Sequence, residues 1–457
     1  MTNLSPLIAT LSGIRGIYGD ELTPEVIKNY TLAFGSLYGP KIVIGRDTRI
    51  SGPEIESIVT KTLLSIGCTP ILLGLATTPA TQLAVEKLNA DGGIIISASH
   101  NPAEWNALKL VAAEGSFLTE SGFKKLQDKL ESGDYDLVDS GSVGESQAYA
   151  KANEDHIELV LSLSHIDVEK IKKRAFKVVV DCVNGVASEV LPNLLKLLGC
   201  EVTEIHCEPN GLFPHTPEPL EKNLPDLIGK TKEIEADAGF AVDPDGDRLA
   251  IVSDGGKYLS EEYTLVIATD VVLSGLPEGQ TVVTNLSTTR AIDDIAGKHG
   301  AEVIRTRVGE INVVQEMKKT DAIIGGEGNG GVILPEAHYG RDALVAAASA
   351  LQFMADSEEP LSELYSKMPQ YVMLKRKVEL GNVPSDSILK SIAEHFSEYD
   401  VDSRDGVKIN KPEGWIHVRV SNTEPIIRIY IEAKTEESAE ALWKEVTEIP
   451  GLLLEQI

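Results

Sequence analysis

The chain has 457 residues, enough for about three domains at about 150 residues each. Hydrophobic residues make up 42% of it and charged residues 25%, as in ordinary globular proteins. The net charge of −28 argues against nonspecific binding to nucleic acid, because a phosphate polymer would be repelled. It does not exclude a small phosphorylated ligand, because a few Arg and Lys focused in a cleft can outweigh the overall charge locally.

The N-terminus and the cysteines favour a cytoplasmic protein. The chain starts Met-Thr-Asn-Leu-Ser-Pro, without the basic and apolar segments of a signal peptide, and no stretch reaches the length of a membrane span. The four cysteines show neither metal-ligand spacing nor a disulfide framework, which is typical of a reducing compartment. We expect no nucleic-acid or membrane partner, and a monomer or homodimer.

One unit occurs three times along the chain. The copies open near residues 41, 177 and 280 with a short β-branched strand, a polar turn and a helix-like stretch. Each helix ends at a glycine that fits a C-cap and leads into a second strand. A third strand closes each copy, and a chemically different loop follows it. Alternating strands and helices predict three tandem α/β/α domains with mixed sheets.

The last part of the chain, from about residue 370, has another pattern. Residues 415–433 are typical of two strands around a polar loop, and residues 435–446 of a capped amphipathic helix. This predicts a smaller C-terminal α+β domain. Because open α/β sheets place ligand groups at strand ends, the four domains are expected to surround one central cleft. Their expected limits are residues 1–150, 151–255, 256–368 and 369–457.

Two glycine-flanked arginine loops precede the first of these strand ends. Arg15 is expected to face a reacting phosphoryl group. Arg46 and Arg49 are expected to hold their own loop by pairing with Asp47 and with backbone carbonyls.

A polar tip follows the apolar run 94–96. The sequence Ser97-Ala-Ser-His-Asn-Pro places small hydroxyls and a proline turn at the end of a buried strand, which favours a site over a core. Ser99 is the candidate nucleophile, and it needs a base, a metal or a cationic neighbourhood. Adjacent residues of an extended chain point opposite ways, so His100 is expected to make local hydrogen bonds rather than serve as the base of Ser99.

The second repeat ends in an acidic loop. Asp243, Asp245 and Asp247 alternate along it, and three crowded carboxylates repel one another unless a cation offsets them. An EF-hand would need glycine at the sixth position and glutamate at the twelfth, where this chain has Arg248 and Asp254. We therefore predict a divalent cation, Mg²⁺, with room left for a phosphate oxygen.

The third repeat ends in the glycine-rich loop 326–331. It satisfies the dinucleotide pattern by accident, because a strand rather than a helix follows, and this excludes a nicotinamide cofactor. Carboxylates accept hydrogen bonds from vicinal hydroxyls. Glu327 is therefore expected to bind sugar hydroxyls from a bare backbone that lets the sugar approach closely.

A turn in the C-terminal domain gathers groups that bind anions. Arg419, Ser421, Asn422 and Thr423 fall in one strand-to-strand turn, and Arg428 lies in the same hairpin. Successive backbone N–H groups beside arginines form an anion nest, which favours a phosphate site over a solvated turn.

Taken together, these loops resemble the α-D-phosphohexomutase superfamily, in particular its archaeal-like phosphoglucosamine mutase and phosphomannomutase branch. The resemblance spans the whole chain and preserves the order of four loops: phosphoserine, metal, sugar and phosphate. It implies that Ser99 carries the phosphoryl group and holds Mg²⁺ together with Asp243, Asp245 and Asp247.

The same resemblance implies a set of residues around the substrate. Arg15, Lys109 and Arg248 would surround the transferring group, with Lys109 as acid and base because a lysine among cations can have a depressed pKa. The residues expected to bind the phosphosugar are His100, Arg307, Glu327, Asn329, Arg419, Ser421, Asn422, Thr423 and Arg428.

The implied activity interconverts hexose 6-phosphate and hexose 1-phosphate through a phosphoserine and a hexose 1,6-bisphosphate. The sugar loop departs from the common family forms, because Gly328, Asn329 and Gly331 replace the variable residue, the serine and the histidine. Glucosamine phosphate is the favoured substrate, with mannose or glucose phosphate as alternatives. A serine-dependent, metal-dependent sugar phosphatase and a non-catalytic phosphosugar sensor are the alternatives from other classes.

Overall fold

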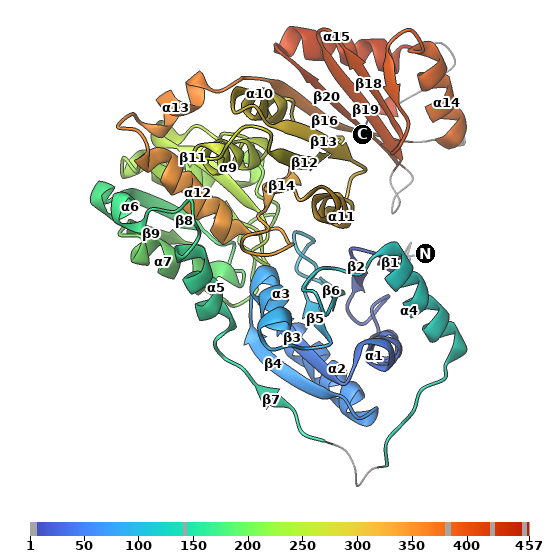
Figure 1. The fold of residues 1–457 in the computed structure, drawn as a ribbon. Helices are drawn as coiled ribbons and strands as arrows, with labels where there is room; N and C mark the ends of the chain where they lie inside the picture. The colour runs from blue at the N-terminus through green and yellow to red at the C-terminus, as the bar shows by residue number, and fades with distance from the viewer. Residues whose placement is uncertain (1–6, 140–143, 380–384, 421–425, 450–454, 457) are drawn as a thin grey trace.

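The structure is a computed structural model that describes residues 7–139, 144–379, 385–420, 426–449 and 455–456 (Figure 1). Within these residues four β-sheets follow one another along the chain. In the described part of the chain, no helix is both long and apolar enough to cross a membrane.

The first sheet has seven strands in the order β1-β2-β6-β5-β3-β4-β7. Its strands are β1 (Ile8–Thr10), β2 (Gly13–Ile17), β3 (Lys41–Arg46), β4 (Thr69–Leu75), β5 (Gly92–Ile96), β6 (Trp105–Ala112) and β7 (Gln147–Ala148). The helices of this part are α1 (Pro24–Tyr38), α2 (Gly52–Ser65), α3 (Thr78–Lys87) and α4 (Glu120–Ser132). All five residues of β5 are buried, as its apolar run predicts.

The second sheet has the order β11-β10-β8-β9. Its strands are β8 (Lys177–Asp181), β9 (Glu201–Ile205), β10 (Ala238–Val242) and β11 (Leu249–Ser253). The helices are α5 (Ala152–Leu161), α6 (Val168–Arg174), α7 (Ala187–Leu197) and α8 (Pro225–Glu233), with the short 3₁₀ turns η2 (Glu221–Asn223) and η3 (Asp254–Gly256).

The third sheet has the order β13-β12-β14-β15. Its strands are β12 (Thr281–Asn285), β13 (Glu302–Thr306), β14 (Ile324–Glu327) and β15 (Gly331–Ile333). The helices are α9 (Glu262–Leu273), α10 (Ala291–Lys298), α11 (Glu310–Thr320), α12 (Ala343–Ala355) and α13 (Leu361–Lys367).

The three repeats share one topology. The first strand of each copy pairs in parallel with the second and third: β3 with β4 and β5, β8 with β9 and β10, and β12 with β13 and β14. A further strand, β6, β11 or β15, pairs antiparallel with the third. The chain therefore leaves the carboxyl end of β5, β10 or β14 through the serine, acidic or glycine-rich loop, and returns along the neighbouring strand.

The C-terminal sheet is antiparallel, in the order β17-β18-β19-β20-β16-β21. Its strands are β16 (Val372–Glu379), β17 (Asp400–Asp402), β18 (Val407–Lys411), β19 (Gly414–Val420), β20 (Ile426–Ala433) and β21 (Glu455–Gln456). Helices α14 (Ser385–His395) and α15 (Glu436–Thr447) accompany it. Three mixed-sheet α/β/α units and a smaller α+β unit confirm the predicted fold class.

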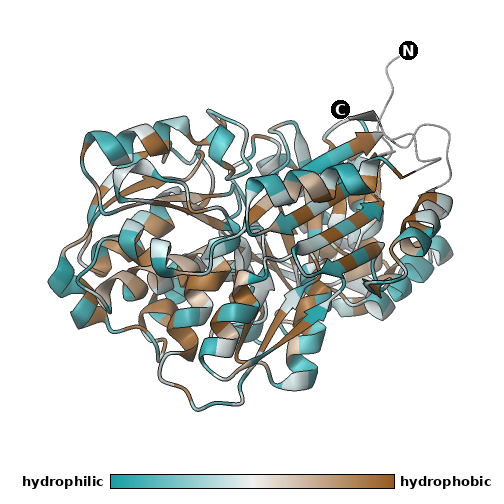
Figure 2. Cartoon of the chain, turned by 90° about the horizontal axis from the view of Figure 1, so that it is seen from above, coloured by the Kyte–Doolittle hydropathy of each residue, from teal (hydrophilic) through white to brown (hydrophobic). Residues whose placement is uncertain are grey.

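Apolar packing joins the second and third sheets. One core runs from Val178 of β8 and Phe240 of β10 to Val282 and Leu344 in the third unit, while the C-terminal sheet has a core of its own around Ile416. The helices covering the sheets show both teal and brown residues in Figure 2, as amphipathic helices do.

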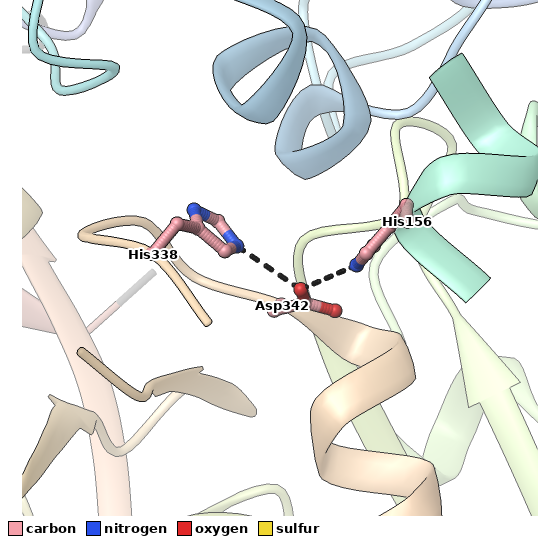
Figure 3. A group of neighbouring side chains, drawn as sticks. All are labelled: His156, His338 and Asp342. Carbon is pink, nitrogen blue, oxygen red and sulfur yellow. Dashed lines mark hydrogen bonds and ion pairs between the residues drawn. The ribbon is translucent and has the colours of Figure 1, made fainter. Parts of the chain in front are cut away.

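A buried cluster fastens α5 to the start of α12 (Figure 3). Nε2 of His156 and Nε2 of His338 donate to the same carboxylate oxygen of Asp342, at 2.6 and 3.0 Å. The other carboxylate oxygen accepts the backbone N–H groups of Leu344 and Val345 and so caps α12. The three side chains are 3% exposed or less, so these hydrogen bonds join the two units out of contact with solvent.

Candidate active site

The serine loop leaves β5 and turns toward the acidic loop of the second unit. Ser99 has a φ of 49°, a left-handed conformation that is uncommon for a residue with a side chain. Its backbone N–H donates to Ser97 Oγ at 3.0 Å, and its hydroxyl donates to Asp243 Oδ2 at 2.7 Å. Ser99 is 3% exposed. Two strand ends that are 144 residues apart in sequence therefore place a hydroxyl and a carboxylate in direct contact.

One buried arginine fixes the shape of the serine loop. Arg49 pairs with Asp47 at 3.0 Å and donates to the backbone carbonyls of Ser99 at 2.6 Å and Asn101 at 2.7 Å. This is the role expected of Arg49. Arg46 makes one of its expected contacts, because Nη1 donates to the Asp47 carbonyl at 3.4 Å, but its ion pair is with Glu56 of α2, at 2.9 Å.

The acidic loop brings three carboxylates together. Oxygen atoms of Asp243, Asp245 and Asp247 lie within 4.8 Å of one another, and all three side chains are 1% exposed or less. Burial and repulsion from the other two carboxylates raise the pKa of Asp243 well above its usual value.

A divalent cation fits this set of donors. Asp245 Oδ1 and Asp247 Oδ1 are buried and have no hydrogen-bond partner among the residues that the structure describes. Buried carboxylate oxygens are costly unless they are paired or bind a cation. The loop therefore presents carboxylate oxygens that accept no hydrogen bond, and Mg²⁺ and Ca²⁺ bind oxygen atoms of this kind.

Lys109 of β6 faces the acidic loop. Its Nζ lies 2.5 Å from Asp245 Oδ2 and 3.6 Å from Asp247 Oδ2, and its side chain is 4% exposed. Burial alone would lower the pKa of Lys109, but the two carboxylates outweigh it and raise the pKa above its usual value. The depressed pKa expected for this lysine is therefore absent here, because its nearest neighbours are anions rather than cations.

Arg15 and Arg248 complete the cationic side of the site. Arg15 donates to Asn101 Oδ1 at 2.9 Å, and Arg248 Nε lies 3.7 Å from Asp247 Oδ1. Burial and the charge of Arg248 lower the pKa of Arg15. His100 lies close enough to both arginines that burial and their charges hold its pKa well below the usual value, so its ring is neutral. Its Nδ1 has no hydrogen-bond partner in the described chain, where we had expected a local hydrogen bond.

Glu327, at the end of β14, is buried, and both of its carboxylate oxygens accept hydrogen bonds. Asn285 Nδ2 and the Gly309 N–H donate to its Oε1, both at 3.0 Å, while Arg341 donates to its Oε2 at 3.0 Å and Asn329 at 3.4 Å. Burial would raise the pKa of Glu327, but the charges of Arg341 and Arg248 outweigh it, so the carboxylate stays ionised.

The glycines of this loop have a packing role. A Cβ at Gly328 would lie 1.8 Å from a carboxylate oxygen of Glu262, and one at Gly330, whose φ is +89°, would lie 2.4 Å from the Leu249 carbonyl. The backbone of this loop, which we expected to let a sugar approach closely, therefore packs closely against α9 and β11 at these two glycines.

Arg341 is a residue that sequence reasoning missed. Its guanidinium contacts Asp247 Oδ2 at 2.7 Å, Glu327 Oε2 at 3.0 Å and Glu310 Oε2 at 3.0 Å. It thereby links the acidic loop to the glycine-rich loop. No motif marks it, because its partner Asp247 is 94 residues away in sequence.

Two further expected residues, Arg307 and Arg419, form ion pairs with carboxylates outside the acidic loop. Arg307 is half exposed and pairs with Glu120 of α4 at 2.8 Å. Arg419 faces Arg428 across β19 and β20, and its Nε pairs with Asp405 at 3.0 Å. Ser421, Asn422 and Thr423 lie outside the described residues.

Models of the four domains of one protein family match this chain in order. They are phosphoglucomutase/phosphomannomutase alpha/beta/alpha domain I (residues 8–136), domain II (154–256), domain III (260–371) and the C-terminal domain (375–449).

Similar proteins match over nearly the whole length. A phosphoglucomutase/phosphomannomutase of Thermococcus kodakarensis is 39% identical over 457 residues, with 97% of each chain covered. A probable phosphoglucosamine mutase of Methanopyrus kandleri is 32% identical over 450 residues, with 98% of each covered. A phosphoglucomutase/phosphomannomutase family protein of Burkholderia thailandensis has a similar solved structure, with a TM-score of 0.86 at 27% identity over 98% of this chain and 100% of that one.

Proposed function

The chain belongs to the phosphoglucomutase/phosphomannomutase family, within the α-D-phosphohexomutase superfamily, and from this premise we propose that it interconverts hexose 6-phosphate and hexose 1-phosphate through a phosphoserine at Ser99. It is an enzyme of the isomerase class that transfers phosphate within a phosphosugar.

One contact carries the assignment of Ser99. Its hydroxyl lies 2.7 Å from Asp243, in a buried site that also holds Lys109 and open carboxylate oxygens. A phosphoryl group on Ser99 would enter surroundings that already contain cationic donors. Such preorganised charge is most of what phosphoryl transfer requires of a protein.

The metal of this proposal is Mg²⁺. Asp243, Asp245 and Asp247 would hold it, together with a phosphate oxygen on Ser99, because Mg²⁺ prefers oxygen ligands and shares its shell with substrate phosphate. The orphaned oxygens of Asp245 and Asp247 support this ligand set. When bound, the ion neutralises charge that develops on the transferring phosphoryl group.

The chain's own residues act around the transfer. The free hydroxyl of the sugar attacks phosphorus, the bond from phosphorus to Ser99 Oγ breaks, and the hydroxyl proton ends on Ser99 Oγ. Lys109, kept charged by its carboxylate neighbours, stabilises the phosphoryl oxygens and replaces the acid–base role first expected of it. The hexose 1,6-bisphosphate then turns over and returns its other phosphoryl group to Ser99.

The far end of the substrate would lie at the C-terminal domain. Arg419 and Arg428, paired across neighbouring strands, supply two guanidinium groups for the phosphate that is not transferred. Glu327 would accept sugar hydroxyls, which requires it to exchange some of its present donors. His100, Arg307 and Asn329 are further proposed contacts.

Glucosamine phosphate is the substrate that we favour, and mannose or glucose phosphate is the second candidate. Relatives named probable phosphoglucosamine mutase support the first, while the 39% identical phosphoglucomutase/phosphomannomutase supports the second. A coupled assay on the 1- and 6-phosphates of the three sugars, primed with the matching bisphosphate, decides between them.

The test of the mechanism is Ser99→Ala. We expect a loss of mutase activity of about 10⁴-fold or more, as for removal of other enzymic nucleophiles. Ser116→Ala is the control, because Ser116 is also buried but its hydroxyl lies by Glu114 and Lys318. Full activity in Ser99→Ala would refute the phosphoserine. Release of free phosphate from hexose 1-phosphate, without any 6-phosphate, would instead identify a phosphatase.

The proposal also places the enzyme in the cytoplasm, as a monomer or homodimer. All four cysteines are free, which supports a reducing compartment.

A further inference from the structure

A second group of metal-ligating side chains lies at the carboxyl edge of the second sheet. Asp181 is the last residue of β8, and its register partner Ile205 is the last residue of the neighbouring strand β9. His206 follows directly, and His215 comes from the loop after it. Ligand atoms of Asp181, His206 and His215 lie within 4.8 Å of one another. The parallel pairing thus brings to one point three residues that are scattered in the sequence.

The hydrogen bonds of His215 place its Nε2 against a carboxylate while Nδ1 already carries the ring hydrogen. Its Nδ1 lies 2.9 Å from the Thr216 carbonyl oxygen. A carbonyl oxygen can only accept a hydrogen bond, so Nδ1 must be the donor and carries the ring hydrogen. In a neutral ring Nε2 then presents a lone pair, yet it faces the two carboxylate oxygens of Asp181 at 3.1 and 3.3 Å. Two electron-rich groups at this distance need a proton or a cation between them. A backbone carbonyl on the other ring nitrogen is the usual orienting contact of a metal-bound histidine.

The surroundings admit an ion from solvent. The side chain of Asp181 is 1% exposed, whereas those of His215 and His206 are 18% and 24% exposed. A surface cavity of about 400 Å³ is lined by Asn184, Glu204, His206, Cys207 and Glu208. Glu208 in this lining, and Asp226 at 3.1 Å from His206 Nε2, place negative charge beside His206, whereas Glu204 is paired with Lys196.

We propose that Asp181, His206 and His215 form a second divalent-cation site, separate from the three aspartates and suited to a transition metal such as Zn²⁺. Two imidazoles and one carboxylate are a common Zn²⁺ ligand set with a fourth position left for water. Mg²⁺ prefers a shell made of oxygen atoms alone. The two sites therefore differ in the metal that they select.

The position of this site suggests what the ion does. Its loop packs on the first unit, where a Cβ at Gly211 would lie 2.2 Å from the Thr48 carbonyl and the Phe213 ring lies 5.0 Å from the Arg49 guanidinium. Arg49 in turn holds the Ser99 carbonyl. An ion between Asp181 and His215 would tie this loop to β8, and so stabilise the junction that supports the serine loop.

The experiment measures Zn²⁺ bound to the full-length protein after removal of metals, by dialysis and elemental analysis with Mg²⁺ present in saturating amount. We expect one Zn²⁺ per chain, a higher thermal midpoint with Zn²⁺, and the visible absorption of tetrahedral Co²⁺ when Co²⁺ replaces it. His215→Asn and His206→Asn should each weaken binding at least about tenfold. If His215→Asn does not fold, His206→Asn, whose side chain is more exposed, gives the same test.

Three controls separate this site from others. His299 also faces an aspartate, Asp270, and its side chain is likewise 18% exposed, but within the described ranges the pair belongs to no metal-ligating group, so His299→Asn should keep full Zn²⁺ binding. Ser99→Ala should bind Zn²⁺ with unchanged affinity. The Zn²⁺ measurement is therefore independent of the proposed role of Ser99 in phosphoryl transfer. Asp245→Asn should weaken Mg²⁺ but not Zn²⁺. Absence of Zn²⁺ binding with Mg²⁺ present, or equal binding by His215→Asn, would overturn the proposal and identify His215 as a protonated partner of Asp181.

Discussion

Two junctions between units are built from charged and polar side chains, yet they use these groups differently. Where the first and second units meet, Ser99 contacts Asp243 and Lys109 contacts Asp245, while one oxygen each of Asp245 and Asp247 has no hydrogen-bond partner among the described residues. Where the third and C-terminal units meet, the polar groups pair with one another.

The contacts of this second junction are direct. Lys375 of β16 lies 2.7 Å from carboxylate oxygens of both Glu261 and Glu262, and Ser287 bonds His417 Nδ1 at 2.8 Å. At the first junction, Asp245 Oδ1 and Asp247 Oδ1 stay available for a ligand, whereas the charges named at the second junction are consumed in docking. Substitutions at the two junctions should therefore fail in different ways.

The largest effect on stability is expected from Arg341→Met. This change leaves Glu310, Glu327 and Asp247 buried without their shared cation, and breaking a buried ion pair costs about 3–5 kcal/mol. Urea unfolding measures it. Arg307→Met, which removes an exposed pair with Glu120, is the control and should cost less than about 1 kcal/mol. Equal effects of both changes would contradict the view that Arg341 is the link between the two loops.

A smaller effect is expected from Lys375→Met at the docking junction. Glu261 and Glu262 would lose their cation, at a cost of about 2–3 kcal/mol because Lys375 is partly exposed. Limited proteolysis should release the C-terminal unit faster than in the native protein. Lys390→Met breaks an exposed pair on α14 and should leave the cleavage rate unchanged. An unaltered rate in Lys375→Met would mean that the apolar contacts alone hold the unit.

The smallest effect concerns pH. Burial lowers the pKa of His417 to about 4, below its ordinary value of 6.5. A depressed pKa contributes stability that is present above 6.5 and is lost as pH falls toward 4, because the unfolded chain takes up the proton first. Between pH 7.5 and pH 5 we expect a loss of about 2 kcal/mol from this group. The C-terminal unit should then become more sensitive to protease at pH 5.

His165 offers a matched control for this pH effect. Burial also lowers its pKa to about 4, but it lies in the second unit, bonded to Ser349. Both His417→Asn and His165→Asn should flatten the pH dependence of stability, and only His417→Asn should change the pH dependence of release of the C-terminal unit. The same response from both variants would remove the distinction between the junctions.

Much of the fold was predictable because its signals are local. The three repeats appear as strand, turn, helix and glycine cap within short windows, and the structure gives all three the same pairing of strands. The triplet Asp243, Asp245 and Asp247 is equally local, since alternate positions of one loop must lie close together.

The parts that escaped prediction involve contacts across the sequence. The expected pKa of Lys109 had the wrong direction, because Asp245 approaches from 136 residues away. The packing of Gly328 on Glu262 and of Gly330 on Leu249 was not predicted either, and the approach of a sugar to this loop stays a prediction. Neither neighbour is visible in the loop itself.

By itself, the amino-acid sequence determined which chemical groups stand at the end of each strand, and in what order, because that follows from periodicity over a few residues. Only the tertiary structure decided which of these groups are satisfied by the protein and which stay open. Arg341 neutralises Asp247 and Glu327 together, while Asp245 Oδ1 and Asp247 Oδ1 have no hydrogen-bond partner in the described part of the chain. The physical reason is that the energy of a buried charge depends on every unit packed around it. The position where a strand ends depends only on the sequence of a few neighbouring residues.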